Sequence, residues 1–255
     1  MDREQVSEET YARLFGPRDT NAPDLDPEFG RILRTFIFAD VFTTGDLDDA
    51  HRELVAVVCL TTLGTLPQLK AHLGGALNVG NSPVALREAI YTCAGFIGFP
   101  RTLQAIGVLN EVLTDRGIDL PLPPQGTVTD DERRKAGWAI QGPLYGDEIR
   151  ALYAGLPAPF ADAIPTFLTE FGFGDFYTRG GLDAAEREFV VLICLTALGG
   201  TEFQLGPHAL ANLKLGTSLS TLLAAVLHCW PYVGFPRASA ALRVLATLDT
   251  NPTDA

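Results

Sequence analysis

The chain has 255 residues, 47% of them hydrophobic, and a formal net charge of −12 at pH 7. This length and apolar content allow one large hydrophobic core or two smaller ones. The acidic balance argues against nucleic acid as a partner, because phosphate binding depends on Lys and Arg, and it requires that an anionic substrate find local positive charge.

Residues 1–5 are polar, and the longest apolar runs, residues 54–60 and 189–195, are too short to span a bilayer. We therefore expect neither a secretory signal nor insertion into a membrane. Two of the four cysteines, Cys59 and Cys194, lie inside those apolar runs, and Cys93 and Cys229 form a second repeat-equivalent pair. Cysteines placed in this way are typical of reduced core thiols, which predicts a cytosolic protein.

The sequence contains one long internal repeat. Residues 47–55 return 135 residues later as residues 182–190, and residues 98–101 return 136 residues later as residues 234–237. One inserted residue near Gly200 accounts for the difference. A period this long indicates two domain-sized copies rather than a solenoid of short units. We assign a first copy, a Pro-rich linker and a second copy to residues 1–120, 121–132 and 133–255.

In the first copy, helix signals follow one another in chain order. Asp48 is an N-cap for a helix that ends at Gly64, and residues 65–68 have the T-x-x-Q pattern of a capping box for the next helix. Ser82 opens a third helix, and Pro100 begins a fourth that continues toward the linker.

The second copy repeats these signals. Asp183 and Glu186 form a capping-box variant, the helix that follows ends at Gly199, and residues 201–204 match the second predicted capping box. No segment shows the sustained alternation of a half-buried strand. The sequence therefore predicts an all-α fold built from two tandem copies.

Each copy places one glutamate and one histidine at equivalent positions, Glu53 with His72 and Glu188 with His208. A short turn would fold the two helices that carry them into an antiparallel hairpin and bring the side chains together. A carboxylate beside an imidazole orients the ring and suits proton transfer. The alternative is a Glu that pairs with a nearby Arg and a histidine satisfied within the core. Recurrence in both copies favours the catalytic interpretation.

The other histidines, His51 and His228, have no histidine counterpart, so we expect structural or surface roles for them. No H-x-x-x-H or H-x-x-E-H spacing occurs, and each copy offers few ligands, so we expect no metal site. Gln68 and Gln204 also recur at equivalent positions and are candidate substrate-binding residues.

Three segments of the first copy, residues 52–54, 67–80 and 98–100, resemble the carboxymuconolactone decarboxylase family. That family belongs to a superfamily with the alkyl-hydroperoxidase AhpD-like proteins. The resemblance is close over residues 47–113 and looser over residues 182–248. It implies tandem AhpD-like helical domains that form an intrachain pseudo-dimer. It also implies a ring-shaped homo-oligomer, with a trimer of two-copy subunits favoured.

The resemblance separates two chemistries. The peroxidase branch carries a C-x-x-C pair just before its histidine, and here those positions are Thr65 and Gln68, or Thr201 and Gln204. Thiol peroxidase chemistry requires a thiolate and a resolving cysteine, which these residues cannot supply. We therefore expect no peroxidase activity and interpret these residues as helix caps.

The decarboxylase branch implies chemistry without a metal or organic cofactor. Loss of carbon dioxide from a carboxylated lactone leaves a dienolate that must be stabilised and protonated at carbon. By resemblance, His72 would hold or polarise the lactone oxygen, and Glu53 would relay the proton. The leading prediction is thus a decarboxylase, a lyase of the kind used in aromatic catabolism.

An anionic substrate needs a cation, and planar bidentate pairing suits arginine. The repeat-equivalent candidates are Arg101 with Arg237, or Arg52 with Arg187. For Arg101 and Arg237 a solvated first-turn position is equally compatible, and for Arg52 and Arg187 a structural ion pair is favoured.

Two alternatives remain beside decarboxylation. One is an isomerase or hydrolase that acts on another enolisable carbonyl compound through the same Glu–His pair. The other is a non-catalytic helical binding or assembly module that retains the motif as a structural network. An enzyme and a non-catalytic module are distinguished by whether Glu53 and His72 line a closed polar pocket or are covered by neighbouring side chains.

We expect the first copy to carry most of the turnover. Small or polar residues such as Gly75 and Asn78 leave room beside its histidine. In the second copy Pro207 precedes the histidine, Lys214 replaces Asn78, and Gly200 is inserted into the turn that sets the Glu–His geometry. A displacement of about 1 Å can cost about 100-fold in rate.

Overall fold

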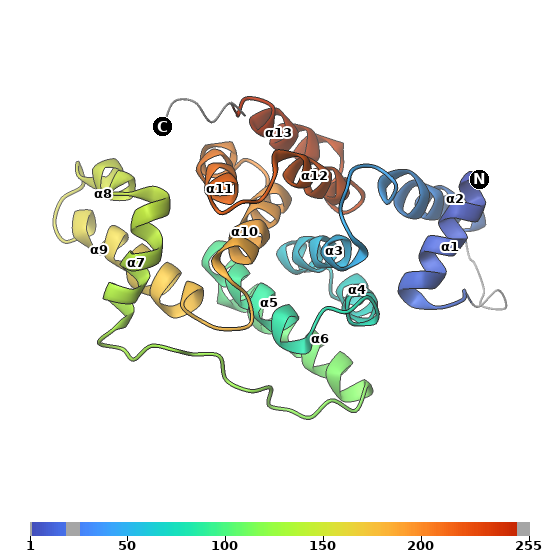
Figure 1. Cartoon of the computed structure of the whole chain (residues 1–255), viewed down its shortest axis with the longest axis horizontal. Coiled ribbons are helices and arrows are strands. Elements are labelled where there is room, and N and C mark those ends of the chain that lie inside the picture. The colour runs from blue at the N-terminus through green and yellow to red at the C-terminus, as the bar shows by residue number, and fades with distance from the viewer. Residues whose placement is uncertain (1, 19–25, 249–255) are drawn as a thin grey trace.

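The computed structural model describes residues 2–18 and 26–248, and within these ranges every regular element is a helix (Figure 1). This confirms the all-α prediction. No helix in the described ranges is long and apolar enough to cross a membrane.

Four helices form the repeated unit of each copy. In the first copy they are α3 (Asp49–Leu63), α4 (Leu66–Asn78), α5 (Pro83–Ile97) and α6 (Phe99–Asp115). Their counterparts are α10 (Ala184–Leu198), α11 (Glu202–Lys214), α12 (Leu219–Val233) and α13 (Phe235–Leu245). These bounds agree closely with the helix signals of the sequence.

The predicted caps are confirmed at the first helix of each unit. The Asp48 side chain accepts a hydrogen bond from the His51 amide, and Asp183 with Glu186 forms a complete capping box. The capping boxes predicted at residues 65–68 and 201–204 are wrong. Neither threonine caps its helix, because Thr201 turns its hydroxyl back to the Leu195 carbonyl at 2.8 Å, and Thr65 similarly faces the end of α3.

Each repeated unit is preceded by an extension that contains a π-helix, which the sequence did not predict. The first extension consists of α1 (Arg3–Phe15), α2 (Pro27–Arg34) and η1 (Thr35–Val41). The second consists of α7 (Arg133–Tyr145), α8 (Glu148–Tyr153), α9 (Phe160–Phe167) and η2 (Leu168–Tyr177). The two extensions lie at opposite edges of the molecule in Figure 1.

The two copies share a single hydrophobic core. Helices α3 and α5 of the first copy pack directly against α10 of the second, and α3 also packs against α12. The four cysteines are reduced and buried in this common core, with residues of both copies around them. The copies therefore form an intrachain pseudo-dimer.

A buried ion pair reinforces the interface between the copies. Glu88 on α5 accepts hydrogen bonds from Arg187 on α10 at 3.2 Å and from Arg179 at 2.8 Å. Neither Glu88 nor Arg187 is exposed. The loop between α6 and α7, which contains the predicted linker, runs along one edge of the molecule (Figure 1). Its Pro123 carbonyl accepts a hydrogen bond from Arg87, which fixes it to the first copy.

Candidate active site

The predicted Glu–His pairs are formed in both copies. The Nδ1 atom of His72 on α4 shares a 2.9 Å hydrogen bond with Oε2 of Glu53 on α3. In the second copy, Nδ1 of His208 lies 2.7 Å from Oε2 of Glu188. Both carboxylates are fully buried, whereas the side chains of His72 and His208 are 11% and 18% exposed. Each imidazole thus connects a buried carboxylate with the outside of its site.

Each site also contains an aromatic ring from the other copy. The ring of Tyr232 on α12 meets His72 edge to face, with centroids 5.4 Å apart. The ring of Phe96 on α5 contacts His208 in the same way at 5.8 Å. Because Tyr232 and Phe96 are repeat equivalents, the two sites are related by the pseudo-symmetry of the core, and both copies are needed to complete either site.

The two carboxylates differ in their hydrogen bonds. Glu188 accepts a 2.7 Å hydrogen bond from the Tyr177 hydroxyl on one oxygen and a 2.7 Å hydrogen bond from Tyr145 on the other. The equivalent residues in the first copy are Phe42 and Phe15, which cannot donate. Oε1 of Glu53 is accordingly buried with no hydrogen-bond partner.

Two further polar atoms of the first site are buried without a partner, the Tyr232 hydroxyl oxygen and Nε2 of His228. Burial raises the pKa of Tyr232 well above its usual value, and the negative charge of the nearby Glu53 raises it further. Burial, together with the charges of Arg52 and His72, holds the pKa of His228 well below its usual value. Both side chains are therefore neutral at neutral pH.

A glycine makes room for the first carboxylate. A Cβ atom on Gly75 would lie 2.7 Å from Oε2 of Glu53 and equally close to the ring of Phe15. Ala211 occupies the equivalent position in the second copy. The polar residue predicted to leave room, Asn78, instead donates to the Leu14 carbonyl at 2.7 Å.

Arg52 has a structural role, which the sequence favoured over its alternative role as a substrate ligand. It is 2% exposed, and its N–H groups donate to backbone carbonyls of residues 41, 44, 45 and 47. Arg52 also contacts Nδ1 of His228 at 3.4 Å, and its guanidinium lies over the ring of Phe42, 5.4 Å from the centroid. Arg187 forms the predicted structural ion pair, with Glu88, whereas Arg52 donates to backbone carbonyl groups instead of forming the predicted ion pair.

The structure does not bring Arg101 and Arg237 to the Glu–His pairs. Each is exposed and donates to a carbonyl near the end of the first helix of its unit, at Thr62 and Ala197. Thr62 lies nine residues from Glu53 along α3, which is about 13 Å of helix. The predicted role of these arginines as substrate ligands at the pairs is therefore not supported.

Gln68 and Gln204 are exposed and lie one helical turn before His72 and His208 on α4 and α11. Residues four apart share a helix face. Each exposed glutamine therefore lies on the same helix face as the histidine that follows it, and its predicted role in substrate binding stays a prediction.

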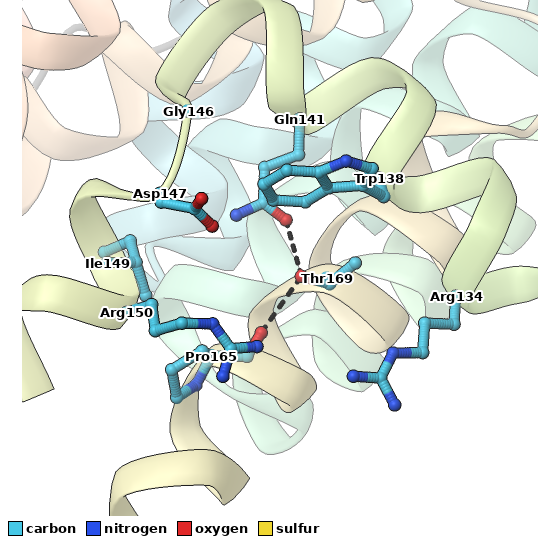
Figure 2. A pocket seen from close by; sticks show the side chains of 9 residues that line it. All are labelled: Arg134, Trp138, Gln141, Gly146, Asp147, Ile149, Arg150, Pro165 and Thr169. Atoms are coloured by element: carbon cyan, nitrogen blue, oxygen red, sulfur yellow. Dashed lines mark hydrogen bonds between the residues drawn. The ribbon is translucent and has the colours of Figure 1, made fainter. Parts of the chain in front are cut away.

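Two surface cavities of about 250 and 300 Å³ occur elsewhere on the molecule. The smaller cavity is lined by residues of α7, α8 and α9. Trp138, Arg134 and Arg150 lie around it (Figure 2). The larger one lies between the copies, beside His51 and Phe189. Neither is lined by the Glu–His pairs. Within the described residues there is also no cluster of three or more His, Cys, Asp and Glu that could hold a metal.

Sequence reasoning missed Tyr232 and His228 as members of the first site. His228 was assigned a structural role because it lacks a histidine counterpart, and Tyr232 has Phe96 at its equivalent position. The available signal was the exchange of polar and apolar residues between equivalent positions. The first site has phenylalanine where the second has tyrosine, at residues 15 and 42, and tyrosine where the second has phenylalanine, at residue 232.

Comparison with known proteins gives a consistent match. The model of the "Carboxymuconolactone decarboxylase family" matches residues 27–111 and 162–247. The 4-carboxymuconolactone decarboxylase of Acinetobacter baylyi is 30% identical over 98 residues, which cover 38% of this chain and 73% of that protein. A solved structure of a proposed gamma-carboxymuconolactone decarboxylase subunit from Burkholderia xenovorans covers 96% of this chain and 97% of its own. Its TM-score is 0.55 at 21% identity, which shows a shared fold.

Proposed function

The chain belongs to the carboxymuconolactone decarboxylase family, and from that premise we propose that it is a cofactor-independent carboxy-lyase. Its substrate is a small carboxylated lactone or a related enolisable acid. The observation that carries the proposal is the Glu53–His72 pair, a buried carboxylate and an imidazole joined at 2.9 Å with one carboxylate oxygen unpaired. Such a pair can hold and move a proton where water is largely excluded.

The reaction follows from the bonds that change. The bond between the ring carbon and the departing carboxylate breaks, and its electron pair passes through the conjugated alkene to the lactone carbonyl oxygen. Carbon dioxide leaves, and a dienolate remains. The Glu53–His72 pair then delivers a proton to carbon and recovers one from solvent through the partly exposed side of His72. The net change consumes one proton for each carbon dioxide released.

We assign this turnover to the first site. Both oxygens of Glu188 are held by tyrosine hydroxyls, so proton transfer at the second site would require breaking hydrogen bonds to a buried carboxylate. Glu53 has an oxygen available, and Gly75 lets its carboxylate approach α4 closely. The second site therefore serves mainly as a structural counterpart.

A second candidate is a non-catalytic helical assembly module, and one observation favours it. The rings of Phe15 and Tyr232 pack against His72, with centroids 5.5 and 5.4 Å away, and neither surface cavity reaches the pair. Under this alternative the Glu53–His72 hydrogen bond would only connect α3 with α4.

We also propose a cytosolic homo-oligomer, with a trimer favoured. No residue of helix α2 is buried. Three of its large apolar side chains are exposed, namely Phe29 at 62%, Ile32 at 51% and Leu33 at 42%. Exposed apolar residues gathered on one short helix suit a subunit interface. Sedimentation velocity of the purified chain tests this assignment, and a monomer at micromolar concentration would contradict it.

The activity itself is tested by a substrate screen. The purified chain is incubated with carboxylated lactones and keto acids while carbon dioxide release and ultraviolet absorbance are followed in parallel. We expect carbon dioxide release that matches the loss of the conjugated substrate and persists in the presence of a chelator. Lactone opening without carbon dioxide would instead indicate a hydrolase, and inertness toward the whole panel would favour the assembly module.

A further inference from the structure

Three buried polar atoms without partners belong to one site. They are Oε1 of Glu53, the hydroxyl oxygen of Tyr232 and Nε2 of His228. The Tyr232 ring lies 5.4 Å from the ring of His72 and 6.2 Å from that of His228. Buried polar groups are almost always hydrogen-bonded, so a group of unpaired ones calls for an explanation. Their position beside the Glu53–His72 pair indicates a polar ligand group that they would contact.

The protonation of these atoms follows from their neighbours. A guanidinium only donates hydrogen bonds, so the Arg52 contact at 3.4 Å makes Nδ1 of His228 an acceptor. The ring is neutral, because its pKa is well below the usual value, and its single proton therefore lies on Nε2. Burial and the nearby Glu53 raise the pKa of Tyr232, so its hydroxyl also keeps its proton. The site thus contains two neutral donors without acceptors.

The second site lacks this pair of donors. Phe96 stands at the position equivalent to Tyr232, and Thr92 at the position equivalent to His228. The Thr92 hydroxyl accepts a 2.9 Å hydrogen bond from Arg187 and donates one of 2.8 Å to the Glu88 carbonyl. The donors are therefore a property of the first site alone, although α12 of the second copy supplies them.

We propose that α12 provides the oxyanion-binding half of the first site, with Tyr232 and His228 donating hydrogen bonds to the substrate oxygen that becomes negatively charged. This inference rests on the proposed function and specifies it further: the ligand is a carbonyl compound whose oxygen receives the electron pair released with carbon dioxide. These two donors act in addition to His72. Preorganised donors in a site that excludes water stabilise such a charge strongly.

Arg52 acts through His228 as a positioning residue. Its hydrogen bond to Nδ1 fixes the ring orientation and polarises Nε2–H toward the site. In this way the site obtains positive potential from an arginine that does not itself contact the substrate. The requirement for local positive charge, imposed by the net charge of −12, is thereby met inside the core.

A binding experiment tests the donors independently of turnover. The probe is 4-nitrophenol, whose phenolate models a delocalised oxyanion and differs in visible absorbance from the phenol. The variants are Tyr232→Phe and His228→Thr, each of which introduces a residue like that at the equivalent position of the second site. Tyr177→Phe is the matched control, because it removes a buried phenol from the other site.

We expect the wild-type chain to bind the phenolate form preferentially. Tyr232→Phe and His228→Thr should each weaken that binding about tenfold or more, the effect of one hydrogen bond to a charged acceptor. Tyr177→Phe should change it less than about twofold. Circular dichroism melts establish that each variant is folded, and if His228→Thr does not fold, Tyr232→Phe decides alone.

The outcomes separate this inference from the proposed function. Phenolate binding that depends on Tyr232, without carbon dioxide release from any acid in the panel, supports the oxyanion site and contradicts the decarboxylase assignment. Carbon dioxide release combined with phenolate affinity that neither substitution changes overturns the oxyanion site alone. Absence of phenolate binding by the wild-type chain also overturns it.

Discussion

The hydroxyl of Tyr177 donates a 2.7 Å hydrogen bond to Oε1 of Glu188. Tyr145 donates a hydrogen bond to the other carboxylate oxygen, so both oxygens of the buried Glu188 carboxylate have a hydroxyl donor. At the equivalent place in the first site, Phe42 leaves Oε1 of Glu53 without a partner. Duplication has thus preserved the Glu–His pair in both copies and changed what surrounds it.

Removing one of these phenols should cost stability. In Tyr177→Phe the buried carboxylate of Glu188 loses a donor, and we expect the free energy of unfolding to fall by about 1–3 kcal/mol. Chemical denaturation of the variant and of Tyr153→Phe, a partly buried tyrosine outside both sites, measures the difference. Decarboxylation by folded Tyr177→Phe should remain within about twofold of wild type. An undiminished stability would show that this hydrogen bond contributes nothing to the fold.

Substitution of the ion pair between the copies should be among the most destabilising changes in the core. Glu88→Gln leaves the fully buried guanidinium of Arg187 without its counter-charge, which typically destabilises by about 3–5 kcal/mol. Glu111→Gln is the control, since it removes an exposed partner of Lys70 and should change stability little. Equal denaturation midpoints for the two variants would contradict this role of Glu88.

Two adjacent glycines provide a test of crowding at the first site. A methyl group at Gly75 would meet Glu53 and Phe15 at 2.7 Å, so Gly75→Ala should displace the carboxylate. We expect about 1–3 kcal/mol of destabilisation and a clear loss of turnover. At Gly74 the nearest atom is the flexible end of Arg116 at 3.4 Å, so Gly74→Ala should be tolerated or stabilise the helix slightly. Comparable activity in both alanine variants would disprove the close approach.

The neutral state of His228 should appear in the pH dependence of stability. Its pKa is lower in the folded than in the unfolded chain, because it is buried near Arg52 and His72. Above the pKa of the unfolded chain, about 6.5, the ring is neutral in both states, so it does not make the free energy of unfolding depend on pH. As the pH falls below that value the unfolded chain binds a proton that the folded chain does not, so stability decreases.

Denaturation at about pH 7.5 and about pH 5 measures this effect. The wild-type chain should lose more stability between the two values than His228→Thr, because only the wild type carries the buried ring. Equal losses of stability in the two proteins would show that His228 does not contribute to the pH dependence of the free energy of unfolding.

The repeat and the local signals predicted much of the fold and the central pair. N-caps at Asp48 and Asp183 fixed where the first helices begin, since each side chain can satisfy only nearby amides. The pairing of Glu53 with His72 followed from a short hairpin turn. Both inferences rely on residues that are close in sequence.

Features that depend on distant contacts could not be predicted in this way. Tyr232 and His228 reach the first site only because α12 packs on α3 across the pseudo-dimer. The periodicity of apolar residues along a helix does not indicate which other helix it packs against. The sequence favoured a structural ion pair for Arg52 but could not identify its carbonyl partners, because a buried arginine and an exposed one have the same sequence signature. Thr65 carries a capping motif, yet its hydroxyl faces the end of α3.

The most direct test of the account compares kcat/KM of Glu53→Gln and Glu188→Gln on the best carboxylated lactone from the screen. Both substitutions preserve side-chain shape and remove the carboxylate from equivalent positions. We predict that Glu53→Gln lowers kcat/KM at least about 100-fold, the lower range for general acid–base catalysis, and that Glu188→Gln lowers it clearly less. If both variants are folded and Glu188→Gln is the more damaging change, the assignment of catalysis to the first site is contradicted.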